Sequence, residues 1–91
     1  MKFAWDELKS ERNFETRGFG FDFAALIFSG LVIEALDSRQ DYGEVRIRAI
    51  GQTQEFVLVV VYTDRGDTRR IISARLANRK ERALWHSFAK L

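Results

Sequence analysis

The most constraining feature of this sequence is the apolar run from Phe56 to Thr63, which reads Phe-Val-Leu-Val-Val-Val-Tyr-Thr. β-Branched and aromatic residues favour a strand, and a strand that lacks polar alternation is buried on both faces. We therefore predict that this run is a central strand. Three further strands are predicted at Leu31 to Leu36, Glu44 to Ile50 and Thr68 to Arg75, with a hairpin turn at Asp64 to Asp67.

The region before the sheet is predicted to contain a short edge strand and two helices. Met1 to Trp5 alternates weakly, as edge strands do. Asp6 is a typical N-cap residue, and the helix from Glu7 to Thr16 that follows it is ended by Gly18. Asp22 to Ser29 is a short apolar second helix. The two helices form an αα-hairpin whose apolar side needs a sheet to cover it.

The C-terminal segment is predicted to be a basic helix from Arg79 to Lys90. Asn78 and Glu81 have the spacing of a capping box at its start. The segregation of helices from strands predicts an α+β fold. Its N-terminal strand and αα-hairpin pack on a mostly antiparallel sheet of four to five strands, and a helix ends the chain.

Length and composition limit the classes of protein to which the chain can belong. Its 91 residues, 46% of them hydrophobic, suit one compact core, so we expect a single domain over residues 1–91. It has no cysteine and one histidine, His86, which exclude a disulfide framework, a thiolate nucleophile and a thiolate zinc site. No apolar run approaches the roughly 20 residues that span a bilayer. With no signal peptide pattern at Met1, we expect a cytoplasmic protein.

Arginine dominates the basic residues, since eleven of the fifteen are arginine although the net charge is only +2. Guanidinium groups bind phosphate oxygens in pairs and stay charged, which suits nucleic acid or acidic partners. Composition alone equally allows arginines that only keep a small surface soluble. Nucleotide-binding, dinucleotide-binding, serine-hydrolase and zincin motifs are absent, so we expect no cofactor and no metal.

One predicted strand carries a candidate catalytic row. Alternation places Glu44, Arg46 and Arg48 on one face, about 7 Å apart. RNA cleavage needs a base for the 2′-hydroxyl proton, cations for the phosphorane charge and an acid for the leaving oxygen. A carboxylate beside two guanidinium groups meets part of this requirement. The same pattern is also typical of a solvated strand face with cross-strand ion pairs.

A second basic cluster is predicted where the last strand meets the final helix. Regular alternation gives one face of this strand the residues Arg69, Ile71, Ser73 and Arg75, and the other face Arg70, Ile72 and Ala74. Arg75 then lies beside a helix N-terminus, which attracts phosphate through its free amides. The first turn of that helix adds Arg79, Lys80 and Arg82. The alternative is a basic surface that binds an acidic partner.

We expect structural roles, rather than roles in RNA binding or catalysis, for the aromatic residues and the histidine. Trp5, Trp85 and the eight phenylalanines fall at apolar positions, so we expect them in the core rather than under RNA bases. His86 lies near the end of the last helix, where a histidine favours the helix dipole or packs beside Trp85. Histidine is a common general acid in RNA cleavage, so a catalytic role for His86 is left open.

Several segments of the chain, in order, resemble the BrnT family of toxins. They are Trp5-Asp6 with Lys9 and Asn13, Gly18 and Phe21, Gly43-Glu44-Val45-Arg46, Ile50-Gly51, Val59-Val60-Val61-Tyr62-Thr63, and Arg70-Ile71-Ile72-Ser73-Ala74-Arg75 with Glu81-Arg82. The last of these is the most specific. The resemblance covers nearly the whole chain, and the predicted element order agrees with it.

The resemblance implies a RelE-like microbial ribonuclease fold and a metal-independent endoribonuclease. It also implies a BrnA-like antitoxin that neutralises the toxin in a hetero-oligomer and alone contacts operator DNA. By position, Glu44, Arg46 and Arg75 inherit functional positions of the family. We predict four catalytic residues, Arg17, Glu44, Arg46 and Arg75, with the arginines as phosphate cations and Glu44 as base or orienter. We predict RNA contacts at Lys9, Arg12, Arg48, Arg79 and Arg82, and expect Arg46 and Arg75 to share one concave surface.

The chain departs from the family at one pair of positions. Members usually carry Lys-His-Gly where this chain has Thr16-Arg17-Gly18. The imidazole that could move a proton is missing, and Arg17 can stabilise phosphate charge but does not release its own proton. Trp85 also replaces a frequent tyrosine. The alternative function is therefore a catalytically weak or inactive member that binds its antitoxin or RNA without cutting.

Overall fold

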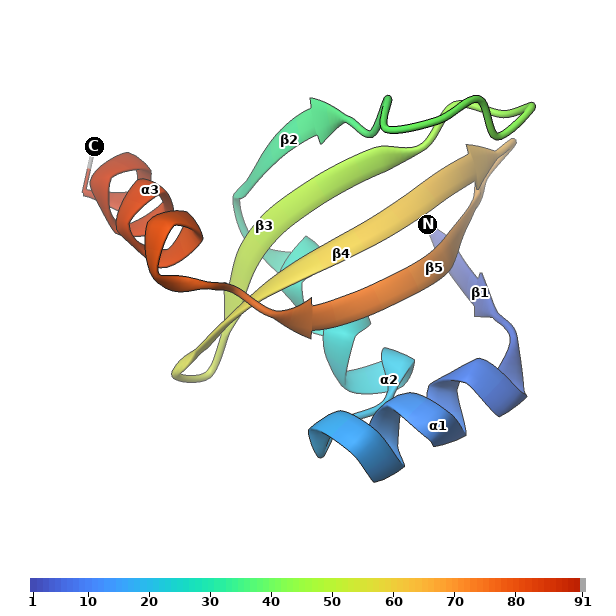
Figure 1. Ribbon diagram of the computed structural model, residues 1–91, viewed down its shortest axis with the longest axis horizontal. Coiled ribbons are helices and arrows are strands. Elements are labelled where there is room, and N and C mark those ends of the chain that lie inside the picture. The colour runs from blue at the N-terminus through green and yellow to red at the C-terminus, as the bar shows by residue number, and fades with distance from the viewer. Residues whose placement is uncertain (91) are drawn as a thin grey trace.

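The computed structural model describes residues 1–90 and has the α+β architecture expected from the sequence (Figure 1). In chain order the elements are β1 (Lys2–Trp5), α1 (Glu7–Arg17), α2 (Phe21–Ala24), the 3₁₀ helix η1 (Ala25–Ser29), β2 (Val32–Leu36), β3 (Ile47–Thr53), β4 (Phe56–Arg65), β5 (Thr68–Leu76) and α3 (Arg79–Ala89). The predicted second helix is real, but its second half tightens from α to 3₁₀ geometry.

The five strands form one sheet in the order β1-β5-β4-β3-β2. The predicted central strand is confirmed, because β4 lies in the middle and Val57 to Thr63 are buried. β2 to β5 pair antiparallel, whereas β1 runs parallel to β5. β1 pairs only with Thr68 to Ile71 of β5, so the remainder of that edge of β5 has no strand beside it.

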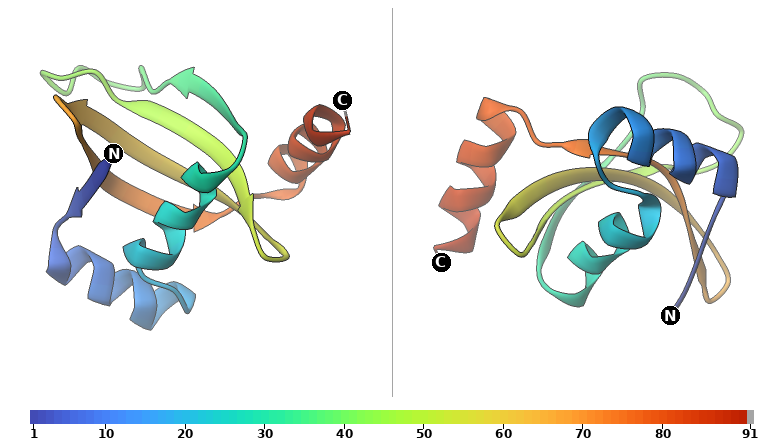
Figure 2. Two further views of the ribbon diagram at one scale, coloured as in Figure 1. Left: turned by 180° about the vertical axis from the view of Figure 1, so that it is seen from behind. Right: turned by 90° about the horizontal axis from the view of Figure 1, so that it is seen from below.

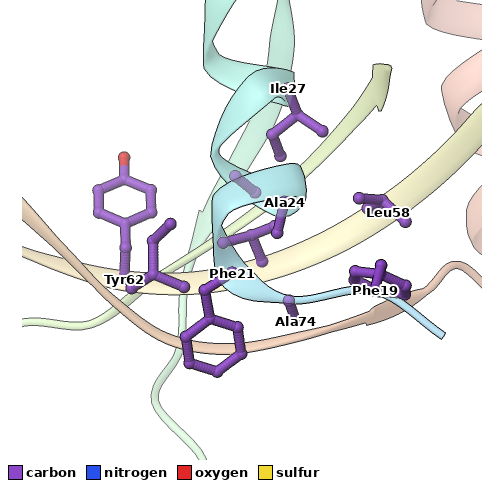
Figure 3. Close-up of a cluster of buried hydrophobic side chains, with 10 residues drawn as sticks. Phe19, Phe21, Ala24, Ile27, Leu58, Tyr62 and Ala74 are labelled. Carbon is purple, nitrogen blue, oxygen red and sulfur yellow. The ribbon is translucent and has the colours of Figure 1, made fainter. Parts of the chain in front are cut away.

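One face of the sheet is covered by α2 and η1, which lie behind the strands in Figure 1 and in front of them in the left view of Figure 2. The core between these layers contains Phe19, Phe21, Ala24, Ile27, Ala49, Leu58, Val60, Tyr62, Ile71 and Ala74 (Figure 3). Close packing requires Gly51 on β3, because a Cβ there would lie 2.9 Å from the Ile27 Cβ. Burial of these apolar side chains is the main stabilising contribution to the fold.

The opposite face of the sheet carries a smaller core where α3 packs against it. Its buried members are Ile50, Val57, Val59, Ala77 and Trp85. Trp85 is only 5% exposed, and its indole Nε1 donates to the Gln52 side chain at 2.9 Å. The expectation that this tryptophan belongs to the core is therefore confirmed. α3 covers the end of this face that is formed by Ile50, Val57 and Val59.

The predicted helix caps are confirmed. The Asp6 carboxylate accepts hydrogen bonds from the backbone N–H groups of Leu8 and Lys9. Gly18 ends α1 with a φ of 89°, a left-handed conformation that glycine adopts without strain. At the start of α3, Asn78 and Glu81 form both bonds of the capping box.

The predicted strand from Glu44 to Ile50 is too long, since β3 begins only at Ile47. The preceding residues belong to the loop after β2, which closes through a 2.8 Å bond from the Asp37 N–H to the Arg46 carbonyl. Gly43 in this loop has a φ of 73°, outside the range of a strand. Glu44 and Arg46 therefore do not form a regular strand-face row with Arg48.

The expected alternation along β5 is also wrong, because a β-bulge interrupts it. Ile71 pairs with Tyr62 but Ser73 pairs with Val61, so Ile72 is an extra residue in the ladder. Ile71 and Ala74 both reach the core under α2, and Ser73 and Arg75 belong to the opposite face. Arg69 stays on the α2 side, where its guanidinium stacks 3.9 Å from the Tyr62 ring centroid.

Candidate functional site

A groove of about 370 Å³ lies between α1 and the free edge of β5. Its apolar lining comes from Phe21, Ile72 and Ala74. Its charged lining comes from Lys9, Arg12 and Arg17 of α1 and Arg75 of β5, and Asn13, Thr16 and Ser73 complete it. We call this the basic groove. Figure 1 shows α1 running beside this edge of the sheet.

Helical spacing explains why α1 presents several polar side chains to one groove. The five α1 residues that line it are Lys9, Arg12, Asn13, Thr16 and Arg17. Residues separated by three or four positions lie on the same face of a helix, so this spacing places all five together.

Two buried or half-buried side chains fix α1 against the turn that follows it. The Ser10 hydroxyl accepts a hydrogen bond from the Phe21 N–H at 2.9 Å. The Asn13 amide donates to the Phe19 carbonyl, also at 2.9 Å. The chain reverses at Gly18, and these bonds hold the reversal against the helix. The position of the cationic side of α1 is therefore set by the fold as well as by helical periodicity.

The β5 side of the basic groove depends on the bulge and on the short β1. Because β1 ends at Trp5, opposite Ile71, no strand covers β5 from Ile72 onward. The bulge at Ile72 then places Ser73 and Arg75 away from the core under α2. Without the extra residue, Arg75 would share the face of Ile71 and point toward the hydrophobic core.

The basic groove is strongly positive. Within residues 1–90, Lys9, Arg12 and Arg17 form no ion pair. Arg75 donates two hydrogen bonds to Glu81, at 2.7 and 2.9 Å. These bonds raise the pKa of Arg75 and hold the pKa of Glu81 to about 2, so both groups stay ionised at physiological pH. The groove thus presents three free cations and one that is shared with a carboxylate.

Glu44 and Arg46 form a separate cluster in the loop before β3. The Glu44 carboxylate accepts hydrogen bonds from Arg65 at 3.1 Å and from Arg46 at 3.2 Å. These two bonds lower the pKa of Glu44 and weaken it as a base. Arg46 also stacks over the Tyr42 ring at 3.9 Å from the centroid. We call Tyr42, Glu44, Arg46 and Arg65 the loop cluster.

The structure brings together only some of the predicted site residues. Arg17 and Arg75 meet in the basic groove with two predicted RNA contacts, Lys9 and Arg12. The expected pocket shared by Arg46 and Arg75 is not formed by this groove, which includes neither Arg46 nor Glu44. The basic groove is also lined by Asn13, Thr16 and Ser73. None of these three was predicted as a catalytic or RNA-binding residue. The three- and four-residue spacing along α1 is the sequence signal that identifies Asn13 and Thr16.

The remaining candidates lie on β3 and α3. Arg48 pairs with Val61 across the sheet and is close enough to Glu81 to help lower the pKa of that carboxyl. Arg82 donates to the Ala77 carbonyl at 2.8 Å, and Arg79 is exposed at the start of α3. His86 is exposed on α3 and lies outside the basic groove.

Residues 1–90 contain neither a membrane-spanning helix nor a metal-binding cluster. None of the helices there has both the length and the apolar character needed to cross a membrane. In the same part of the chain, no group of three or more histidine or carboxylate side chains is arranged to hold a metal ion.

Comparison with known proteins places the chain in a family. No curated protein matched the sequence. The family model described as ribonuclease toxin, BrnT, of type II toxin–antitoxin system matches residues 5–81. This match covers most of the chain, and it includes every residue that lines the basic groove. The chain therefore belongs to the BrnT family of ribonuclease toxins of type II toxin–antitoxin systems.

Proposed function

We propose that this protein is a metal-independent endoribonuclease toxin that binds and cleaves RNA in the basic groove, in the cytoplasm. The observation that carries this proposal is the convergence of Lys9, Arg12, Arg17 and Arg75, from two elements far apart in sequence, on one groove. Guanidinium and ammonium groups gathered in this way suit the phosphates of a single RNA strand.

Cleavage in this groove proceeds by attack of the ribose 2′-oxygen on the adjacent phosphorus. The P–O5′ bond breaks as the new P–O2′ bond forms. The 2′-hydroxyl loses its proton and the leaving O5′ gains one, which leaves a 2′,3′-cyclic phosphate and a 5′-hydroxyl. Negative charge grows on the phosphorane oxygens in the transition state. Arg17 and Arg75 supply fixed positive charge there, and such preorganised charge is commonly the largest catalytic contribution.

Proton transfer is the weak part of this site. None of the residues that line the basic groove is a histidine or a carboxylate. Arginine does not give up its proton at accessible pH, so Arg12, Arg17 and Arg75 act in the groove as fixed charges. Thr16 and Arg17, where the family usually has lysine and histidine, both line the groove. That coincidence supports the groove as the reaction site and predicts slow cleavage.

The loop cluster is the second possible location for the chemistry. Glu44 would act there as base or orienter, with Arg46 as the phosphate cation. Its carboxylate already accepts bonds from two guanidinium groups, which favours a role in holding the loop. We therefore assign cleavage to the basic groove and an accessory RNA contact to Arg46.

The family implies an antitoxin partner, and we propose a BrnA-like protein that forms a hetero-oligomer with the toxin. In this arrangement only the antitoxin contacts operator DNA. The start of α3, with exposed Arg79, Lys80 and Arg82, offers a positive surface for an acidic segment of that partner.

Expression of the protein alone tests the proposed function. Wild-type protein is expected to stop growth and fragment cellular RNA, and purified protein is expected to cleave RNA in the presence of a chelator. Arg17→Ala and Arg75→Ala should abolish cleavage, while Lys80→Ala, which lies outside the groove, should retain it. Circular dichroism spectra of all variants control for folding. Intact RNA with the folded wild-type protein would overturn the proposal.

A binding module that holds RNA or antitoxin without cutting is the second candidate. The absence of an imidazole from the residues that line the basic groove favours it. In that case a fluorescent RNA would bind, with loss of binding in Arg17→Ala, yet remain uncut after long incubation. Cleavage at a rate typical of endoribonucleases would exclude this candidate.

A further inference from the structure

A second groove, of about 360 Å³, adjoins the basic groove at the C-terminal end of α1. Most of its lining is apolar, from Phe14, Phe19, Phe23, Phe56 and Leu76. Asp22 and the turn from Arg17 to Gly20 complete it. We call this the aromatic groove. Its volume lies in the range of small-ligand sites.

The aromatic groove contains exposed phenylalanine rings that we expected, from the sequence, to lie in the core. Phe14 is 63% exposed and Phe56 is 40% exposed. The Phe23 ring lies 6.0 Å from Phe56 and 5.8 Å from Phe19, between centroids, so the wall is continuous from exposed to buried rings. Exposed aromatic faces of this kind are used to stack the bases of single-stranded nucleic acid.

The two grooves adjoin at Arg17, which lines both of them. A nucleotide whose phosphate is bound by Arg17 can therefore place its base in the aromatic groove. Exposed rings beside a phosphate-binding cation favour a nucleobase as the occupant.

The single acidic side chain of the aromatic groove narrows the choice of base. The Asp22 carboxylate forms no hydrogen bond or ion pair with residues 1–90 and folds over Gly20, whose Cβ would lie 2.8 Å from its Oδ1. A carboxylate only accepts hydrogen bonds, through two oxygens. Guanine has two adjacent donors, N1–H and the N2 amino group, on its Watson–Crick edge. Adenine, cytosine and uracil each place an acceptor beside their donor.

We propose that the aromatic groove is a guanine-preferring nucleobase subsite, in which the base stacks on Phe14 and Phe56 and donates two hydrogen bonds to Asp22. The proposal deepens the proposed function and rests on it for the position of the adjacent phosphate. Such a subsite makes the toxin bind and cleave RNA preferentially at sites that contain guanine. Recognition of one base by a stacking surface and one edge is the usual mode for single-stranded RNA.

The test uses four oligouridine RNAs that carry G, A, C or U at one central position. Anisotropy with 2′-O-methyl versions measures binding, and the unmodified RNAs show the cleaved position. The guanine RNA is expected to bind roughly tenfold or more tightly than the others, from two charge-assisted hydrogen bonds. Cleavage is expected beside the guanine. Equal affinity for all four RNAs overturns the proposal.

Two pairs of variants separate the contribution of Asp22 to base preference from the contribution of Phe14 stacking to affinity. Asp22→Asn should abolish the guanine preference, while Glu11→Gln, which lines neither groove, should retain it. Phe14→Ala should weaken all four RNAs by roughly 5- to 100-fold through lost stacking. Leu8→Ala on the same helix, with the same 63% exposure, should have no effect.

The outcomes distinguish failure of this inference from failure of the proposed function. Guanine preference in binding without any cleavage supports the subsite and overturns the proposed ribonuclease activity. Cleavage without base preference retains the activity and overturns the subsite. If Phe14→Ala and Asp22→Asn weaken binding of the antitoxin but leave RNA binding unchanged, the aromatic groove is a protein contact and the proposal is wrong.

Discussion

RNA binding in the basic groove is expected to weaken with salt by an amount that the structure sets. Each cation that neutralises a phosphate releases counterions, with a slope of about −0.7 per phosphate for a single strand. The groove offers three unpaired cations, and Arg75 is shared with Glu81. Three to four phosphate contacts give a slope of about −2 to −3, or roughly a 20- to 50-fold loss of affinity between about 50 and 200 mM salt.

Arg12→Ala tests this count most cleanly, because Arg12 lines only the basic groove and has no ion pair within residues 1–90. The slope should become shallower by about 0.7, measured by anisotropy with an uncleavable 2′-O-methyl RNA. Lys80→Ala, at the start of α3 and outside the groove, is the control and should change the slope less. An unchanged slope for Arg12→Ala, or an equal change for Lys80→Ala, would refute the assignment of the groove.

Three further variants test other parts of the structure. Glu81→Ala should cost about 1 to 2 kcal/mol in urea unfolding at pH 7, from lost bonds to Arg75 and the helix cap. Because the folded-state pKa of Glu81 is about 2 against an ordinary 4.5, this stabilisation is present above pH 4.5, and the difference from wild type should vanish as the pH falls through 2. Gly51→Ala should lower stability by about 1 to 3 kcal/mol in thermal unfolding, because its Cβ would lie 2.9 Å from Ile27. Thr16→His, which adds an imidazole to the basic groove and keeps the Arg17 cation, should raise cleavage near neutral pH about 100-fold, and an unchanged rate would show that proton transfer is not limiting.

Most of the fold could be predicted from local chemistry. The apolar run of β4 identified the centre of the sheet, because only a strand buried on both faces tolerates such composition. Asp6, Gly18 and the pair of Asn78 and Glu81 marked helix ends through bonds within a few residues. Such features need no knowledge of distant contacts.

The features that the sequence did not predict depend on distant pairing. The bulge at Ile72 follows from how β5 aligns with β4, and it reverses the faces of Ser73 and Arg75. Likewise, Glu44 and Arg46 alternate with apolar neighbours as a strand would, but the Asp37 bond to the Arg46 carbonyl closes them into a loop. The alternation of polar and apolar residues alone cannot distinguish a regular strand from a bulged strand or a loop.

The candidate site was therefore only partly predictable. Arg17 and Arg75 were identified as phosphate cations, and the structure brings them to one groove. Their meeting depends on the turn at Gly18, which positions α1, and on the short β1, which leaves β5 uncovered. The aromatic groove was missed because Phe14 and Phe56 have the composition of core residues, and only their exposure distinguishes them.

RNA is expected to bind between α1 and β5, and mapping of amide chemical shifts locates the binding surface residue by residue. Isotope-labelled protein would be titrated with a short uncleavable RNA and followed by NMR. The largest shifts are expected at Lys9, Arg12, Arg17 and Ser73. Shifts confined to the loop cluster around Tyr42, with α1 unaffected, would contradict this binding site.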